Sequence, residues 1–361
     1  MTVRQRILIV EGGSQRGALA ATRALGRAGH EVTIASGERA YAPRSRWATR
    51  WVPINIVESG RMVDDVERCV RQHRCDVVFA GDDESLLTLS RHRDRLGDAR
   101  FPYVAHDHVL RAVDKLSLHE AGRAAGIATP ETTLEEPLDR RDWIVKERLY
   151  LLGTLHDHPL ADEVETRRSG RLVYQRVVDG DLHSVIVFVD ADGTPCILSV
   201  QRAEALYPEL FGISCRSAVI SSAVLEDATR ALFAVLQWRG LAQLQFVMEA
   251  GGAPYLIDFN GRFFGSLALT EAHVPACDAW VDLAMGRPAP ALGRVPTGAR
   301  YQWLEGDLRR ALSTSQRTSS LRDALMSSRG ETHSLFAVAD PKPAAGVIGD
   351  MARRALGRLR G

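Results

Sequence analysis

The sequence has no excess of charge of either sign and no long hydrophobic run. Its 361 residues include 46 Lys and Arg against 45 Asp and Glu, which gives a net charge of +1. Nucleic-acid-binding domains usually carry a clear basic excess, so the composition argues against a nucleic-acid partner. No apolar stretch approaches the length of a membrane span, and the run at 7–10 is too short for a secretory signal. We therefore expect a cytoplasmic protein without a membrane span.

Several motifs of known chemistry are also missing. The five cysteines are odd in number and include no Cys-x-x-Cys pair, which predicts free thiols rather than a disulfide framework. The Gly-x-Ser-x-Gly pattern of many serine hydrolases is absent. The glycines at 12–17 lack the Gly-x-Gly-x-x-Gly spacing, and the strand that follows them ends at Ala35-Ser36 without a ribose-binding acid. The sequence therefore argues against a dinucleotide site.

The first hundred residues alternate short apolar runs with helical patterns. Strands are expected at 7–10, 32–35 and 76–80, and helices at 18–29 and 62–73. This βαβ pattern is typical of an α/β domain, in which helices cover the faces of a parallel sheet.

The middle of the chain has the mixed pattern of an α+β domain. A helix is expected at about 114–125 and another at 224–237. Strands are expected at 143–146, 172–178, 183–189 and 196–200, followed by a hairpin with strands at 242–248 and 254–259. We place domain boundaries near residues 105 and 290, which gives domains at 1–105 and 106–290 and a C-terminal extension at 291–361.

The second strand of the hairpin carries a row of polar side chains. Residues two apart in a strand point to the same face, so Asp258 and Asn260 share a face and Arg262 extends the row. Gln245 on the partner strand can lie opposite them. Oxygen ligands suit Mg²⁺, and a guanidinium fits the oxygens of a phosphate. On these residues alone, a metal–phosphate site and a solvated hairpin explain the pattern equally well.

Three motifs precede the hairpin in a characteristic order. Lys115 opens a helix, Lys146 ends a strand, and the strand at 175–178 runs into a turn. Together with the stretch at 245–266, this order resembles the ATP-grasp superfamily. The resemblance is strongest to its branch that contains biotin carboxylase and the carbamoyl-phosphate synthetase large chain. It covers roughly residues 1–290.

The resemblance implies a fold and a set of site residues. The fold is a parallel-sheet domain followed by a two-lobed ATP-grasp domain, whose smaller lobe covers the nucleotide at about 128–180. The nucleotide-binding residues that it implies are Lys115, Lys146, Gln175, Arg176, Val177, Val178 and His183. The implied metal ligands are Gln245, Asp258 and Asn260, and the implied catalytic residues are Arg262 and Lys146. For His183, a position on the sheet surface is the alternative.

Two departures from the family pattern bear on these roles. Asp258 stands where the family usually has Glu, so its shorter side chain needs a closer backbone or a bridging water. The loop at 147–158, which is normally glycine-rich, contains only Gly153. A loop with few glycines exposes its amides less readily to a phosphate. The cluster His156-Asp157-His158 in this loop is either a metal or substrate site or a solvated loop.

The resemblance implies a ligase that depends on ATP and Mg²⁺, with Mn²⁺ as an alternative metal. Such an enzyme activates a small-molecule carboxylate as an acyl phosphate and couples it to an amine or a similar nucleophile, forming ADP and phosphate. The family also makes a homodimer the expected assembly. The first alternative is an enzyme that activates bicarbonate, although no second synthetase half or biotin-carrier segment is visible. The second alternative is a non-catalytic ATP-binding module, which the glycine-poor loop favours.

Further polar residues have two interpretations each. Ser14 and Arg16, at the start of a predicted helix, either hold a substrate carboxylate or belong to a tight turn. The acids at 82–84 either bind a substrate ammonium or cap a helix. Arg202 and Arg216 are candidates for contact with the triphosphate or the substrate.

Overall fold

Four parallel strands form the N-terminal sheet, in the order β3-β2-β1-β4. The computed structural model describes residues 3–13, 15–56, 58–139, 141–149, 172–209 and 212–349. The strands are β1 (Arg6–Glu11), β2 (Glu31–Ser36), β3 (Arg50–Pro53) and β4 (Val77–Ala80). Apart from the edge strand β3, they consist mainly of buried aliphatic residues, as expected where helices cover both faces. The predicted parallel sheet is confirmed.

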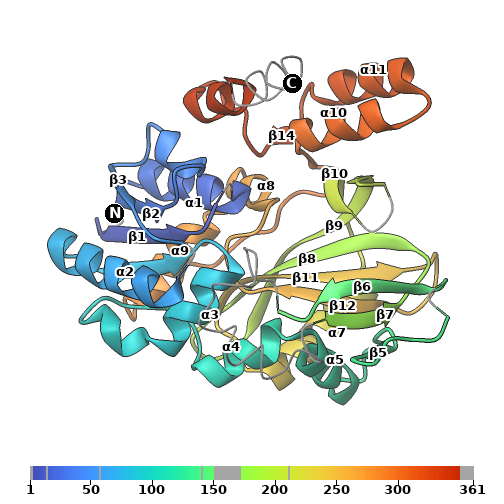
Figure 1. Cartoon of the computed structure of the whole chain (residues 1–361), viewed down its shortest axis with the longest axis horizontal. Coiled ribbons are helices and arrows are strands. Elements are labelled where there is room, and N and C mark those ends of the chain that lie inside the picture. Colours follow the sequence, from blue (N-terminus) through green and yellow to red (C-terminus); the bar gives the residue numbers. More distant parts are fainter. Residues whose placement is uncertain are drawn as a thin grey trace.

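Helices pack on the two faces of this sheet. The alternation of side chains along β1 directs Ile7 and Ile9 toward α1 (Arg16–Arg27), and Leu8 and Val10 toward α2 (Ser59–His73) and α3 (Asp83–Arg91). Figure 1 shows α1 and α2 on opposite sides of the blue strands. The short 3₁₀ helices of this part are η1 (Ala42–Arg44) and η2 (Arg93–Leu96).

A seven-stranded sheet forms the centre of the molecule, in the order β12-β11-β8-β9-β10-β13-β14. All neighbours pair antiparallel except β13 and β14. The strands are β8 (Asp181–Val189), β9 (Pro195–Tyr207), β10 (Ile213–Ile220), β11 (Gly240–Met248), β12 (Tyr255–Asn260), β13 (Arg300–Gln302) and β14 (Thr332–His333). The last two come from the chain beyond residue 290, so this segment extends the central sheet.

Smaller elements complete the middle of the chain. A three-stranded sheet in the order β5-β7-β6 contains β5 (Thr132–Thr133), β6 (Trp143–Glu147) and β7 (Leu172–Arg176). The helices around it and the central sheet are α4 (His106–Val113), α5 (Lys115–Ala124) and α7 (Ala223–Leu236). Every strand and helix expected for this region is present, although β5, β10 and α4 were not expected.

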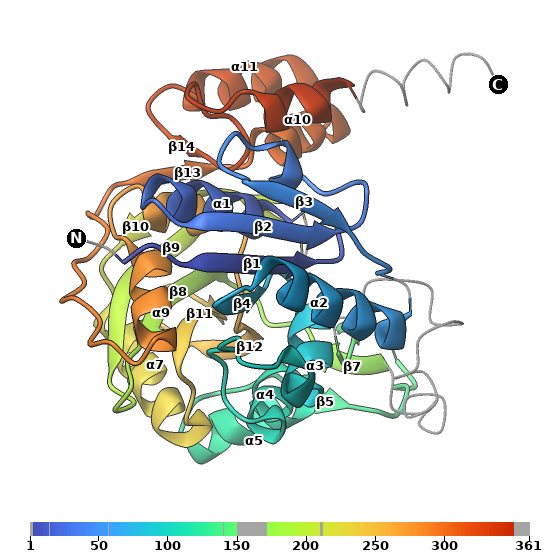
Figure 2. The same ribbon diagram turned by 90° about the vertical axis from the view of Figure 1, so that its left-hand side faces the viewer.

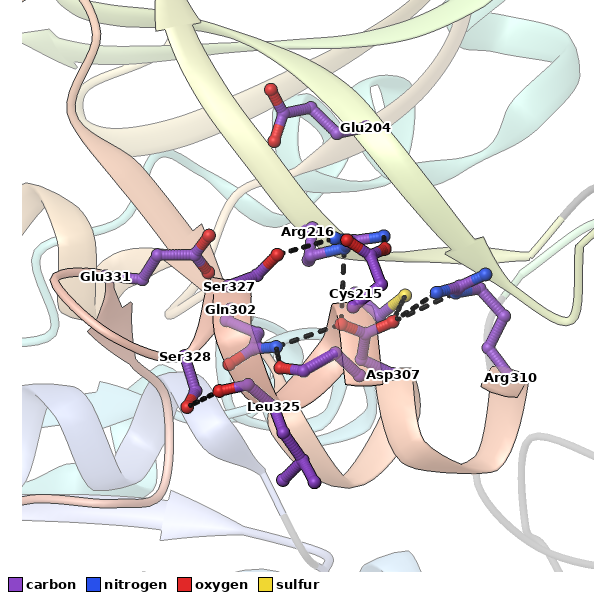
Figure 3. Close-up of polar contacts among 12 residues, drawn as sticks. Glu204, Cys215, Arg216, Gln302, Asp307, Arg310, Leu325, Ser327, Ser328 and Glu331 are labelled. Carbon is purple, nitrogen blue, oxygen red and sulfur yellow. Dashed lines mark hydrogen bonds and ion pairs between the residues drawn. The ribbon is translucent and has the colours of Figure 1, made fainter. Parts of the chain in front are cut away.

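Helices α8 (Leu267–Glu271), α9 (Ala276–Ala284), α10 (Leu304–Ser313) and α11 (Arg317–Ser327) follow β12, and residues 342–349 are helical as well. The buried Asp307 of α10 holds this end of the chain to the central sheet (Figure 3). Its carboxylate forms an ion pair with Arg216 of β10 at 3.2 Å. It also accepts hydrogen bonds from Gln302 of β13 and from Arg310 of its own helix, each at 2.9 Å. Arg216 also pairs with Asp323 of α11 at 2.8 Å.

The structure bears on the expectations for the cysteines and for membrane-spanning helices. All five cysteines are free thiols, and Cys196 alone is more than slightly exposed, which confirms the expectation of no disulfide. In the part of the chain that the structure describes, no helix combines the length and apolarity that crossing a bilayer requires.

A second buried ion pair ties the C-terminal segment to α1. Arg23 donates from Nε to Asp340 at 2.8 Å, and the two side chains are only 6% and 2% exposed. The same guanidinium donates to the carbonyl of Leu335 at 2.9 Å. Asp340 also accepts hydrogen bonds from Ser45 Oγ at 2.7 Å and from the backbone of Arg46 at 2.9 Å. The segment at 335–340 is therefore held against α1 and the N-terminal domain (Figure 2).

We predict that Asp340→Ala lowers the free energy of unfolding by about 3–5 kcal/mol, because it leaves the buried Arg23 without a counter-charge. Urea unfolding of the full chain measures the effect. The matched control is Asp139→Ala, which breaks an exposed pair with Arg141 and should leave the free energy of unfolding nearly unchanged. The double variant Arg23→Met with Asp340→Leu should recover most of the loss. Equal effects of the two single variants would contradict the assignment.

Candidate active site

One cleft, with a volume of about 370 Å³, is lined by strands of the central sheet and by residues at the starts of α1 and α3 of the N-terminal domain. Five of the site residues implied by the family resemblance lie on its wall: Lys115, Gln245, Asp258, Asn260 and Arg262. They come from the start of α5, from the β11–β12 hairpin and from the loop after β12. The cleft also receives the first residues of α1 and α3, which begin at the carboxyl ends of the N-terminal strands.

The register of the hairpin sets its polar side chains in pairs. Gln245 lies opposite Asp258, as the strand pattern predicted, and Gln243 lies opposite Asn260. Gln243 also lines the cleft, and its Oε1 accepts a hydrogen bond from Asn260 Nδ2 at 3.3 Å. The sequence analysis missed Gln243, although the same two-residue period from Gln245 could have identified it.

The donor set on this hairpin fits a magnesium ion. Asp258 supplies one carboxylate, and Gln245 and Asn260 supply amide oxygens, all hard donors of the type that Mg²⁺ uses together with phosphate oxygens and water. A site richer in acids or thiols is not found, since the described residues contain no group of three or more His, Cys, Asp or Glu side chains able to hold a metal.

The position of Lys115 follows from how α5 begins. Asp114 caps the helix by accepting hydrogen bonds from the backbone of Leu116 at 2.9 Å and Ser117 at 3.1 Å, and it pairs with Arg148 at 2.6 Å. Lys115 is thereby fixed as the first helical residue, with its side chain only 6% exposed. Its Nζ lies 3.6 Å from Asp258 Oδ1, so the expected phosphate lysine and the expected metal carboxylate are neighbours.

Lys146 lies on β6 and donates to Gln175 Oε1 on the adjacent strand at 2.6 Å. Burial lowers the pKa of Lys146 to about 8; Asp258 opposes this shift and Lys115 adds to it. The buried Gln175 also reaches Thr132 Oγ1 at 3.3 Å and His119 Nε2 at 3.4 Å. Its side chain therefore holds Lys146 in place, whereas the family resemblance assigned it to adenine.

The other predicted nucleotide-binding residues, apart from Lys115, lie away from the cleft wall. Arg176 ends β7 and pairs with Glu131 at 3.6 Å, with both side chains more than half exposed. Val177 and Val178 follow the strand, and the backbone N–H of Val177 donates to the Asp142 carbonyl at 2.7 Å. His183 is buried in β8, and its Nδ1 lies 2.9 Å from the carbonyl oxygen of Asp181. Burial lowers the pKa of His183. The nucleotide-binding roles of these residues stay predictions.

Arg262 forms a two-point ion pair across the cleft wall. Its Nη2 and Nε donate to the two carboxylate oxygens of Asp83 at 2.9 and 3.3 Å. Burial acts to lower the pKa of Arg262, but attraction by Asp83, Asp258 and Asp82 outweighs it and raises the pKa. The arginine predicted to stabilise a phosphoryl group is thus present in the cleft together with a counter-charge.

The acids at 82–84 serve the start of α3. Asp82 is the N-cap: it accepts from the backbone of Ser85 at 2.8 Å, and its other oxygen accepts from the backbone N–H of Gly12. Burial raises the pKa of Asp82. Of the two interpretations from the sequence, the helix cap accounts for Asp82, and Asp83 is the partner of Arg262.

Several other sequence candidates lie elsewhere. Arg216 was expected to face the triphosphate or the substrate; instead it contacts Asp307 and Asp323 of the C-terminal helices and does not line the cleft. Its bulged strand and the buried Asp307 explain this orientation. Arg202 is exposed on β9. Ser14, Gly153 and the cluster at 156–158 lie outside the described residues.

The sequence also missed the aromatic part of the cleft. Tyr301 of β13 and Trp303, which follows that strand, line the cleft beside Arg16. No motif marks them, because they come from the C-terminal segment beyond the family resemblance and meet Arg16 only through the fold.

No protein-family model matches this sequence, and no curated protein matches it. Several solved structures, in contrast, are similar to this one. An L-amino acid ligase from Bacillus licheniformis shares 14% identity, with 83% of this chain and 79% of that chain covered and a TM-score of 0.60. An N5-carboxyaminoimidazole synthetase from Staphylococcus aureus, complexed with ADP, shares 14% identity over 81% of each chain with a TM-score of 0.60.

A biotin carboxylase from Campylobacter jejuni, in a βγ-ATP complex, gives a TM-score of 0.60 at 13% identity, covering 81% of this chain and 74% of that chain. All three are ATP-grasp ligases. At such low identity the likeness concerns the fold alone. It shows that the chain has the ATP-grasp fold that its motifs predicted.

Proposed function

We propose that this protein is an Mg·ATP-dependent ligase that activates a carboxylate as an acyl phosphate and transfers the acyl group to an amine or a similar nucleophile. The observation that carries the proposal is the meeting of Lys115, Gln245, Asp258, Asn260 and Arg262 on one cleft wall. The ATP-grasp fold supports it, as do the ADP and ATP-analogue complexes of two similar structures. The proposal includes the domain boundaries near 105 and 290, the roles given to the site residues and a homodimeric assembly.

The chain's own residues supply charge and position. Phosphoryl transfer needs little covalent chemistry from a protein, because catalysis consists mainly of aligning the reactants and neutralising charge on oxygen. Lys115, which lies 3.6 Å from Asp258, and Lys146, which Gln175 positions, would hold the phosphates of ATP. Arg262 would hold the transferred group, because its planar fork fits two oxygens at once.

Gln245, Asp258 and Asn260 would hold Mg²⁺, which when bound supplies positive charge to the phosphate oxygens. Asp258 therefore has two tasks, since it also balances the charge of Lys115 at 3.6 Å before the nucleotide binds. No protein nucleophile takes part, so the amine attacks the activated acyl group directly and phosphate leaves.

The function is tested by ADP release from Mg·ATP in the presence of amino acids, other small carboxylates and bicarbonate, with hydroxylamine as a general acceptor. We expect one acid to yield ADP together with its hydroxamate, which reports an acyl phosphate. ADP release with bicarbonate alone would instead support the carboxylase-like alternative. Tight ATP binding without ADP release under any condition would support a non-catalytic module, and absence of ATP binding would overturn the proposal.

We predict that Asp258→Asn raises the Mg²⁺ concentration needed for half-maximal ADP release by about 10- to 100-fold, the usual scale when a metal site loses one supporting group. The matched control is Glu249→Gln, which removes a carboxylate from the exposed turn of the same hairpin and should leave the titration unchanged. An identical Mg²⁺ titration for Asp258→Asn and the wild type would assign Asp258 a structural role only.

We predict that the affinity for Mg·ATP falls as the pH rises above about 8. The pKa of Lys146 is about 8, so its side chain is cationic below this pH and neutral above it. The dissociation constant should be nearly constant below about pH 7, be about twofold higher at pH 8 and then rise by up to about tenfold per pH unit.

Lys146→Arg, which stays charged, should bind with little pH dependence over the same range, and Lys146→Met should bind weakly throughout. Equilibrium binding between pH 7 and 9.5 measures all three proteins. A wild-type profile parallel to that of Lys146→Arg would show that Lys146 does not contact the nucleotide.

A further inference from the structure

Arg16 presents a guanidinium to the cleft in a fixed position. It is the first residue of α1, and its Cζ lies 4.0 Å from the centre of the Trp303 ring. Its Nη1 donates to the hydroxyl of Tyr301 at 2.9 Å, and that hydroxyl donates to the carbonyl of Gly265 at 2.8 Å. Stacking on an aromatic ring and a hydrogen bond to a phenol thus orient the cation without neutralising it.

Close backbone packing places this guanidinium beside the loop that carries Arg262. A Cβ atom at Gly17 would lie 2.5 Å from the carbonyl carbon of Phe263, so the start of α1 rests directly on the backbone of this loop. A Cβ atom at Gly265 would lie 2.9 Å from Arg16 Nη2. Arg16 is therefore a neighbour of the proposed phosphoryl-transfer residues in the same cleft.

The balance of charge on the cleft wall distinguishes Arg16 from the other cations. Lys115 has Asp258 at 3.6 Å, and Arg262 has Asp83 at 2.9 Å. Within the described ranges, Arg16 makes no ion pair with any carboxylate. A cation held in a cleft without a counter-charge favours an anionic ligand, and a planar guanidinium fits a carboxylate or a phosphate that accepts two hydrogen bonds. In a ligase that acts on carboxylates, the carboxylate is the substrate group available to it.

We propose that Arg16, supported by Trp303 and Tyr301, binds a carboxylate of the substrate that is not the one being activated. The substrate class is thereby narrowed to compounds with such a second carboxylate: an α-amino acid as acceptor or a dicarboxylic acid as acyl donor. The inference rests on the proposed function only for the identity of the cleft as the substrate site. The C-terminal segment then has a role in specificity, because it provides both aromatic partners of Arg16.

The test is isothermal titration calorimetry of the full chain in Mg·ADP, where no turnover takes place. The ligands are L-glutamate, L-alanine and glutarate, their matched amides L-alaninamide and glutaramide, and phosphoserine and inorganic phosphate. We expect at least one carboxylate to bind, and Arg16→Gln to weaken it by about 10- to 100-fold, the scale of a charged hydrogen-bonded contact. Trp303→Leu should weaken it less, and the amides should bind equally to wild type and Arg16→Gln.

The matched control is Arg46→Gln, which removes an arginine stacked on Trp47 at 5.4 Å outside the cleft and should change no affinity. Unchanged affinity for Mg·ADP in Arg16→Gln shows that the variant is folded. Equal carboxylate affinity in wild type and Arg16→Gln, no binding of any carboxylate, or Arg16-dependent binding of the phosphoryl compounds alone would each overturn the proposal.

This experiment separates the carboxylate site from the ligase activity. Arg16-dependent carboxylate binding without ADP release under any condition would sustain the site while contradicting the ligase. ADP release from an acid that binds equally well to Arg16→Gln would do the reverse.

Discussion

The ion pair between Arg262 and Asp83 joins two parts of the chain that are 179 residues apart and holds the cleft in its form. Arg262 follows the last strand of the hairpin, and Asp83 is the first residue of α3, which follows β4 of the N-terminal sheet. Each charge is buried, so neither would tolerate loss of the other, and the pair fixes the loop after β12 against the first domain. The same loop contacts the start of α1, which brings Arg16 into the cleft. The pairing thus sets both the proposed catalytic wall and the proposed substrate wall.

Counter-charges keep this cleft stable before any ligand arrives. The cations Lys115, Arg262 and Arg16 share one partly buried cleft and would repel one another strongly. Two of them have a carboxylate beside them: Asp258 lies next to Lys115, and Asp83 next to Arg262. A phosphate or a metal that binds there must replace part of one of these ion pairs. The free energy of binding therefore depends on how much stronger the new contact is than the pair it replaces. Among the described residues, the partners of Arg16 are an aromatic ring and a phenol, so a carboxylate that binds there displaces none of the carboxylates in that part of the chain.

The sequence was sufficient for features that depend on local pattern, and it failed where distant segments meet. The period of two along β12 predicted the shared face of Asp258 and Asn260, and the apolar runs predicted the central strands. The orientation of Arg216 could not be predicted, because it depends on Asp307, about 90 residues later and in a helix with no motif. The contact between Arg16 and Tyr301 spans 285 residues, so nothing in either segment alone indicates it. The family resemblance made Arg216 a candidate for contact with the triphosphate or the substrate, yet the buried Asp307 binds it elsewhere.

The environment of Lys146 shows how a neutral partner can serve a charged ligand. An acid in place of Gln175 would raise the pKa of Lys146 and form an ion pair with it. The glutamine oxygen instead accepts a hydrogen bond from Lys146 at 2.6 Å and adds no charge. His119, behind the glutamine, has a pKa of about 4 through burial and the nearby cations, so it is neutral at pH 7 and adds no repulsion. Lys146 is therefore held in place by a neutral partner that does not balance its positive charge. A phosphate bound beside it would stabilise the protonated form of Lys146, which burial disfavours. Gln175 thus positions a lysine, and its contact with adenine, which the resemblance implied, stays a prediction.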